Sequence, residues 1–177
     1  MNSSEHTPKV LQSLDELITA LTEGERATFS HIINSITFTP NTFDKYCSWS
    51  NESYTRNCII NNEDFELILI CWSEGHRTPI HDHGGEECWV KVIDGNFREV
   101  IYQKDEVGEL KAIKTTISKP NEVTYMKDFM GYHSLENISN KRSMSLHLYA
   151  KPIRECRAYD ENTKTFKSRF LSYNTTI

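Results

Sequence analysis

The chain has 177 residues, and its 20 Lys and Arg against 25 Asp and Glu give a formal net charge of −5. This length favours one domain over two, and the negative charge argues against nucleic acid or an anionic membrane as the main partner, because both select clustered positive charge. The 37% hydrophobic and 11% aromatic residues argue for a packed core over disorder.

The cysteines and the first residues bear on the cellular compartment. Five cysteines form an odd set without a C-x-x-C pair, which excludes a simple disulfide framework and a cysteine-rich zinc module. The longest apolar run, residues 65–72, is too short to span a bilayer and contains Glu66. Residues 1–7 are polar and lack the pattern of a secretory signal. We therefore expect one soluble, cytoplasmic domain over residues 1–177.

The first part of the chain predicts two or three short α-helices in a helical region of about 9–50. Residues 13–16, Ser-Leu-Asp-Glu, fit a capping box that precedes apolar residues at helical spacing. A second amphipathic stretch, 29–36, ends before Pro40, which cannot continue a helix. A third short helix would hold the aromatic residues at positions 43, 46 and 49. The polar residues 1–10 are expected to fray.

From about residue 53 to about residue 172 the pattern changes to strands. Short segments rich in β-branched and aromatic residues alternate with turn signals, such as the hairpin sequence Asp94-Gly95-Asn96. The expected strands are 54–60, 65–73, 78–83, 87–93, 97–103, 111–118, 122–126, 133–138, 143–150 and 164–172. Many short strands without intervening helices predict an all-β sandwich, jelly roll or barrel.

Two histidines, His81 and His83, are two positions apart in a predicted strand. Because side chains alternate along a strand, both rings should face the same side and could share a metal. An H-x-H pair also occurs often by chance, so a pair of surface or core histidines is the alternative. The spacing from Gly75 through the two histidines and Cys88 to Gly95 resembles the first metal motif of the cupin superfamily.

A third ligand would come from a later strand. His133 and Asn137 reproduce the H-x3-N end of the second cupin motif, whereas its P-x-G part is absent. Cys88 occupies the position of the glutamate that completes a four-ligand cupin site, and Glu87 would face the opposite side. Three neutral imidazoles without a carboxylate would leave about three open positions on an ion. Such a set could also hold zinc.

Two further segments place polar groups on strands. Ser145, His147 and Tyr149 share one face of the predicted strand 143–150. They form either an outward polar stripe or an inward hydrogen-bond chain in which Ser145 and His147 orient the Tyr149 hydroxyl towards the metal. Arg56 begins the first strand, where an arginine is more often a surface residue. If it points inward, its guanidinium suits a substrate carboxylate.

Five stretches together resemble the cysteine dioxygenase family, a branch of the cupins. They read Tyr-Thr-Arg-Asn at 54–57, Cys-Trp-Ser-Glu-Gly-His at 71–76, Ile-His-Asp-His at 80–83, Gly-Tyr-His at 131–133 and Ser-Leu-His-Leu-Tyr at 145–149. The resemblance runs from about residue 43 to about residue 170. It implies a cupin jelly roll behind N-terminal helices. It also implies oxidation of free L-cysteine by O2 to cysteine sulfinic acid.

The same resemblance implies roles for individual residues. It implies iron(II) held by three histidines, His81, His83 and His133. It further implies that Arg56 pairs with the cysteine carboxylate, with Tyr54 supporting this arginine. A thioether cross-link would join Cys88 to Tyr149 beside the iron. His147, Ser145 and Cys156 would complete the surroundings of the site. The family suggests a monomer that acts on L-cysteine and O2, without a nucleic-acid or membrane partner.

Two alternatives stay open from the sequence. Dioxygenases for 3-mercaptopropionate or a related thiol share the fold, but they lack the equivalent of Cys88 and place the carboxylate-binding arginine elsewhere. Cys88 and Arg56 therefore favour cysteine. The other alternative is a zinc- or nickel-binding cupin that serves as a binding or regulatory module or as an isomerase.

Overall fold

The structure is a computed structural model that describes residues 10–176. Its N-terminal part is helical, as predicted. The helices are α1 (Leu14–Glu23), the 3-10 helix η1 (Arg26–Thr28), α2 (Phe29–Asn34) and the 3-10 helix η2 (Pro40–Tyr46). Most of the segment expected to fray, residues 1–9, lies outside the described residues, and so does His6. Within residues 10–176, no helix combines the length and apolar character needed to cross a membrane.

The start of α1 confirms the predicted helix cap. The Ser13 hydroxyl accepts a hydrogen bond from the Glu16 amide at 3.1 Å, which satisfies one of the free N–H groups at a helix start. The Glu16 carboxylate reaches back to the Gln12 amide at 2.7 Å, one residue beyond its usual partner in a capping box. The second helix ends two residues earlier than its apolar pattern, because Ile36 forms a bridge with Leu11 instead.

Strands make up the rest of the chain, which confirms the all-β class behind short helices. They are β1 (Thr55–Asn61), β2 (Glu66–Trp72), β3 (Cys88–Asp94), β4 (Phe97–Lys104), β5 (Leu110–Ser118), β6 (Val123–Met126), β7 (Tyr132–Asn137), β8 (Ser143–Tyr149), β9 (Glu155–Asp160), β10 (Thr165–Phe170) and β11 (Thr175–Thr176), with the 3-10 helix η3 (Asp128–Met130) before β7. A six-stranded sheet has the order β11-β1-β2-β8-β3-β6, a three-stranded sheet the order β5-β4-β7, and β9 and β10 form a hairpin.

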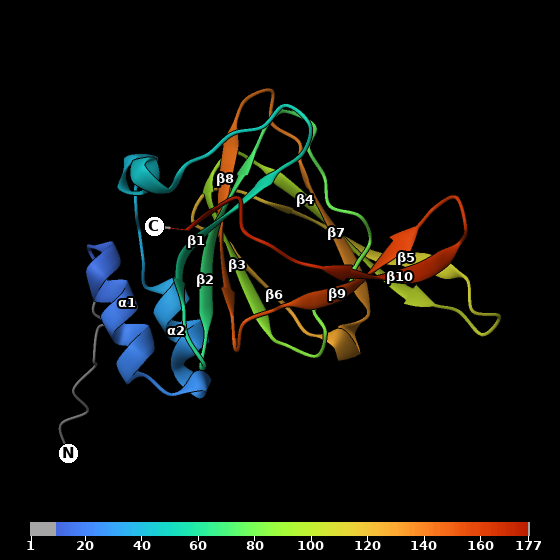
Figure 1. Cartoon of the computed structure of the whole chain (residues 1–177), viewed down its shortest axis with the longest axis horizontal. Coiled ribbons are helices and arrows are strands. Elements are labelled where there is room, and N and C mark those ends of the chain that lie inside the picture. Colours follow the sequence, from blue (N-terminus) through green and yellow to red (C-terminus); the bar gives the residue numbers. More distant parts are fainter. Residues whose placement is uncertain (1–9, 177) are drawn as a thin grey trace, which may run out of the picture.

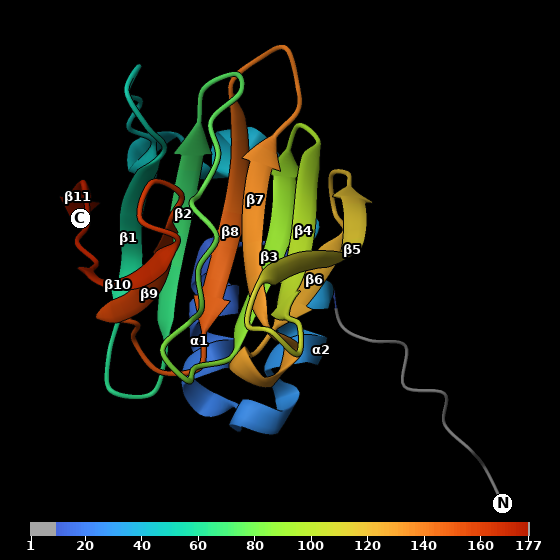
Figure 2. The same ribbon diagram turned by 90° about the vertical axis from the view of Figure 1, so that its right-hand side faces the viewer.

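The two faces of the six-stranded sheet are covered differently. Figures 1 and 2 show α1 and α2 on one side of it, and the β5-β4-β7 sheet with the β9–β10 hairpin on the other. Leu67, Leu69, Leu146 and Leu148 belong to the apolar cluster that includes the helices. Ile68, Ile70, Trp72, Phe97 and Leu135 belong to a second cluster between the sheets. Alternation along β2 and β8 produces this division.

Three strand expectations differ from the structure. The predicted strand 78–83 is wrong: this segment contains only isolated bridges, from His81 to His133 and to Ala158. Pro79 lacks the N–H that a regular ladder needs. The strands β9 and β11 were not predicted, because β9 carries mostly polar, partly exposed residues and β11 has only two residues. The single-domain organisation over residues 1–177 stays a prediction.

Candidate active site

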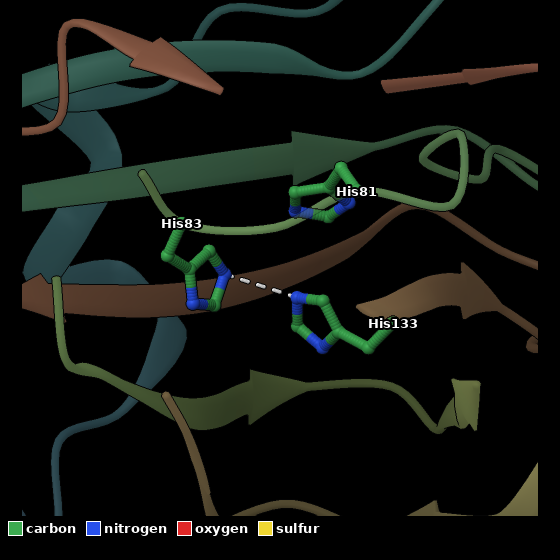
Figure 3. Close-up of side chains that lie close together, drawn as sticks. All are labelled: His81, His83 and His133. Atoms are coloured by element: carbon green, nitrogen blue, oxygen red, sulfur yellow. Dashed lines mark hydrogen bonds between the residues drawn. The ribbon is translucent and has the colours of Figure 1, made fainter. Parts of the chain in front are cut away.

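Three histidine rings converge between the two sheets, as the motif spacing predicts. One nitrogen each of His81, His83 and His133 lies within 4.8 Å of the others, and Figure 3 shows the three rings facing one another. His133 comes from β7, and the other two come from the extended segment before β3. Although this segment is not a regular strand, paired backbone hydrogen bonds of 2.9 Å join His81 to His133. This bridge holds the segment extended, so both of its rings reach the same place.

Hydrogen bonds set the proton positions on two of these rings. Nδ1 of His81 lies 2.9 Å from the carbonyl oxygen of Pro79, and because a carbonyl only accepts, we assign the proton to Nδ1. Nδ1 of His133 lies 2.7 Å from the buried carboxylate of Glu99, which assigns its proton in the same way. In its neutral form, each of these rings presents an unprotonated Nε2. Partners of this kind orient the ligand rings in metal sites.

The cluster fits a divalent transition metal. Nε2 of His133 and Nε2 of His83 are 3.0 Å apart, and two nitrogens bound to one ion at about 2.0–2.1 Å lie roughly that far from each other. Burial, and then the neighbouring His133, lowers the pKa of His81 to about 3. The same causes hold the pKa of His83 well below its usual range. His81 and His83 are thus neutral near pH 7, as metal ligation requires.

The inward face of β8 is polar and buried, so the interpretation as an outward stripe is wrong. Ser145, His147 and Tyr149 are all buried. Nε1 of Trp72 donates to the Ser145 hydroxyl at 2.9 Å, and this hydroxyl lies 2.8 Å from Nε2 of His147. We assign the hydroxyl proton to that contact, which leaves the imidazole proton on Nδ1. Burial keeps the pKa of His147 well below its usual value, and its Nδ1 is buried without a hydrogen-bond partner in the described structure.

Cys88 and Tyr149 are direct neighbours across β3 and β8. The adjacent pair is hydrogen-bonded, since the Ala150 amide donates to the Glu87 carbonyl at 3.0 Å. Narrow and wide pairs alternate in an antiparallel ladder, so Cys88 and Tyr149 form the non-hydrogen-bonded type, in which side chains are closest. Both residues are buried. Burial and the thiol of Cys88 raise the pKa of Tyr149 well above its usual range, while a hydrogen bond with Arg56 opposes this rise.

Arg56 points inward from β1 and is buried. Its Nε and Nη2 atoms are buried and have no hydrogen-bond partner within residues 10–176. Burial alone would lower the pKa of Arg56, but Tyr149 and Glu66 raise it above its usual value. A buried guanidinium with two unpaired N–H groups is costly unless an acceptor arrives.

One cavity brings these groups together. Its wall includes the three histidines of the cluster, Arg56 and His147. Tyr54 and Cys156 also line it. The Tyr54 ring lies 4.9 Å from the Trp72 ring, measured between centroids. Most sequence-predicted site residues thus line this cavity. Tyr149 and Ser145 contact the lining residues His83 and His147, and Cys88 is the strand neighbour of Tyr149.

The structure adds three residues that the sequence interpretation did not select. Glu99 contacts His133, Glu66 contacts Arg56, and Arg169 lines the cavity from β10. A signal existed for the two glutamates, because each occupies an inward position in an apolar strand, with Phe97 and Ile101 beside Glu99. Arg169 lies in an exposed, polar strand, where the sequence offers no signal of this kind.

Comparisons with known proteins agree with this site. Residues 3–162 match the sequence profile of the family "Cysteine dioxygenase type I". Cysteine dioxygenase type 1 from Homo sapiens is 30% identical, over 92% of this chain and 88% of that protein. The Bos taurus protein of the same name is 31% identical over the same shares. A protein with a double-stranded beta-helix domain from Klebsiella pneumoniae superposes with a TM-score of 0.52 at 17% identity, over 71% of this chain and 97% of that chain. The likeness to this structure concerns the fold alone, and the sequence matches show that the chain belongs to the cysteine dioxygenase type I family of enzymes.

Proposed function

We propose that this enzyme is an iron(II)-dependent thiol dioxygenase that oxidises free L-cysteine with O2 to cysteine sulfinic acid. The observation that carries the proposal is one cavity with two complementary parts. Three histidine nitrogens converge in its wall. The same wall contains the buried Arg56, two of whose nitrogens have no hydrogen-bond partner among the described residues. A small thiol with a carboxylate satisfies both parts at once.

The proposed metal ligands are Nε2 of His81 and of His133, with His83 as the third. When bound, iron(II) supplies affinity for a thiolate and redox chemistry towards dioxygen. Glu99 contacts Nδ1 of His133, and a partner of this kind orients a ligand ring. The three ligands include no carboxylate, so the anionic thiolate would compensate part of the charge of the ion.

Arg56 is the proposed partner of the substrate carboxylate. Nε and Nη2 lie on one edge of the guanidinium, and this edge can donate two parallel hydrogen bonds to a carboxylate. Tyr54 lies beside this arginine in the cavity wall and would limit where the guanidinium moves. Nδ1 of His147 is a further buried donor at the cavity. Ser145 fixes the orientation of that ring.

Tyr149 and Cys88 are the proposed cross-linked pair. Forming the thioether removes one hydrogen from the Cys88 thiol and one from the Tyr149 ring, and the two electrons and two protons pass to dioxygen. The close, non-hydrogen-bonded pairing of these residues supports it. Peptide mass spectrometry of protein after many turnovers should detect a Cys88–Tyr149 peptide pair lighter by two hydrogen atoms. Uncrosslinked peptides alone would refute the cross-link.

Oxygen uptake by iron-loaded protein tests the substrate assignment. With L-cysteine, 3-mercaptopropionate and 2-aminoethanethiol as substrates, we expect cysteine to give the highest kcat/KM. The variant Arg56→Ala should raise KM for cysteine while iron content stays unchanged. Arg98→Ala removes an arginine that pairs with Glu136 on the surface and is the matched control. Unchanged affinity for cysteine in Arg56→Ala would overturn this role of the arginine.

Two observations favour alternative functions, and the same oxygen-uptake assay tests them. Arg169 provides a second guanidinium in the cavity wall, which favours 3-mercaptopropionate if that group binds the carboxylate. A cluster of three histidines also suits zinc, as in a cupin that binds ligands without oxygenase activity. Faster turnover of 3-mercaptopropionate identifies the first candidate, and zinc with no oxygen uptake after iron reconstitution identifies the second. The cytoplasmic location and the monomeric state stay predictions from the sequence.

A further inference from the structure

A buried carboxyl group lies beside the proposed substrate-binding arginine. Glu66 begins β2 and is fully buried. It is the Cα partner of Tyr149 in the β2–β8 ladder, and Tyr149 is in turn the partner of Cys88. One row across the sheet therefore carries Glu66, the phenol and the thiol side by side. Burying a carboxylate is costly unless hydrogen bonds and opposite charges compensate it.

Four groups compensate the burial of Glu66, and one of them is Arg154, whose Nη1 lies 3.9 Å from Oε1. Its Oε2 accepts from the Ile153 amide at 3.0 Å, and its Oε1 accepts a short hydrogen bond from the Tyr173 hydroxyl. Nη2 of Arg56 lies 3.8 Å from Oε1. The Tyr173 hydroxyl is itself held, because it accepts from Arg154 at 2.8 Å and from the Asn61 amide group at 2.9 Å. These contacts hold the Glu66 carboxyl group in one position.

The segment that carries Tyr173 also holds the backbone of Arg56. The Asn174 amide donates to the Arg56 carbonyl at 2.7 Å, and the Arg56 amide donates to the Asn174 side chain at 2.8 Å. The following strand, β11, pairs with β1 in parallel, and Figures 1 and 2 show the C-terminal end of the chain beside β1. Asn174 thus holds the backbone of Arg56, and Tyr173 binds the carboxyl group of Glu66 that contacts the guanidinium.

The orientation of the guanidinium follows from this arrangement. Glu66 attracts Arg56 from the sheet without forming a hydrogen bond to it, since the contact is 3.8 Å. Nε and Nη2 therefore keep their hydrogen-bonding capacity for a ligand. Tyr149 contacts the guanidinium as well, with the ring centroid 6.0 Å from Cζ. Without the anion, the arginine would be a buried, uncompensated charge with freedom to turn towards solvent.

We propose that Glu66, fixed by Tyr173 and the Ile153 amide, is a positioning residue that holds Arg56 towards the cavity and so sets the preference for thiols that carry a carboxylate. This inference rests on the proposed role of Arg56 in substrate binding. Glu66 acts through the arginine and not on the reacting atoms. Its loss should therefore weaken binding of carboxylate-bearing thiols and leave carboxylate-free thiols unaffected.

Binding under anaerobic conditions gives the test. Titration calorimetry on iron-loaded protein compares L-cysteine with 2-aminoethanethiol, which lacks the carboxylate. In Glu66→Gln, which keeps the side-chain size, the Kd for cysteine should rise about tenfold, the size expected for a charge-assisted contact. The Kd for 2-aminoethanethiol should not change. Glu109→Gln is the control, because Glu109 is an exposed carboxylate that also pairs with a basic residue.

A second variant covers the case in which Glu66→Gln does not fold. Tyr173→Phe keeps the carboxylate but removes its phenolic donor, and we expect a smaller shift in the same direction. An unchanged ratio of the two Kd values in the folded variants would overturn the inference. An equal loss of affinity for both thiols would overturn it too, since that indicates a general structural role. If the native enzyme itself neither binds cysteine nor forms sulfinate, the proposed function fails instead.

Discussion

The two faces of β8 are equally buried and yet do different things. Leu146 and its neighbours on one face pack against the helical layer, where apolar contacts are complete. Ser145, His147 and Tyr149 on the other face lie between the sheets. Between the sheets, nitrogens of His147 and of nearby Arg56 have no hydrogen-bond partner within residues 10–176. Burial alone therefore does not separate a structural face from a functional one, whereas unsatisfied polar groups do.

Removing a metal ligand from the polar side should have the largest effect. In His83→Ala we expect iron content and sulfinate formation to fall more than the roughly 10–100-fold that loss of an outer partner causes. The fold should persist, because the apolar face is untouched. Elemental analysis and circular dichroism check this result. His31→Ala, at an exposed position in α2, is the control. Full iron content in His83→Ala would contradict the site.

A cavity on the apolar face of β8 should lower folding stability and leave metal and substrate binding unchanged. Leu146 is fully buried against the helices, so Leu146→Ala should destabilise the protein by about 2–5 kcal/mol. Urea unfolding measures this loss. Iron content and KM of the protein that remains folded should match those of the native enzyme. A changed KM at full iron content would show that the two faces are coupled and would break the comparison.

Low pH should reduce the folding stability of the metal-free protein, because His81 on the polar side resists protonation when the chain is folded. The pKa of His81 is lowered from 6.5 to about 3, so the unfolded chain takes up a proton below about pH 6.5 that the folded chain does not. Stability therefore falls with decreasing pH, by about 1.4 kcal/mol per pH unit for one such histidine. Unfolding of metal-free protein at about pH 7 and about pH 5.5 checks this. Equal stability at both would contradict neutral, buried rings.

The mildest substitution changes Glu99, the residue that contacts the metal-ligating His133. Glu99→Gln keeps an acceptor for Nδ1 of His133 but removes the charge. Iron affinity should fall about 10–100-fold, with no loss of folding stability comparable to that of Leu146→Ala. Competition with a chelator gives the affinity. Glu136→Gln, which breaks a surface pair with Arg98, should leave iron affinity unchanged, and an equal effect in both variants would remove Glu99 from the account.

Local patterns were enough to predict the helices, most strands and the grouping of the three histidines. The position of His81 and His83 on one side was predicted for the wrong reason, because a bridge to His133, and not a regular strand, holds the segment extended. The pairing of Cys88 with Tyr149 depends on the register of two strands 61 positions apart in the chain. No local pattern specifies such a register, so only the family resemblance led to it.

Long-range contacts explain what the sequence interpretation missed. Glu66 was noticed as a charge within an apolar run, but its meaning depends on Tyr173 and Arg56, which meet it only in the fold. Arg169 reaches the cavity because the β9–β10 hairpin folds back over it. Of the two strands in this hairpin, the sequence predicts only β10, since the residues of β9 are mostly polar and partly exposed.

In the proposed reaction, both oxygen atoms of O2 are transferred to the sulfur of cysteine at this site. Mass spectrometry of the product formed by iron-loaded enzyme under oxygen-18 gas is the decisive measurement. We expect cysteine sulfinic acid that carries two labelled oxygen atoms. Product with one labelled atom and one from water, or no sulfinic acid at all from protein with a full complement of iron, would contradict it.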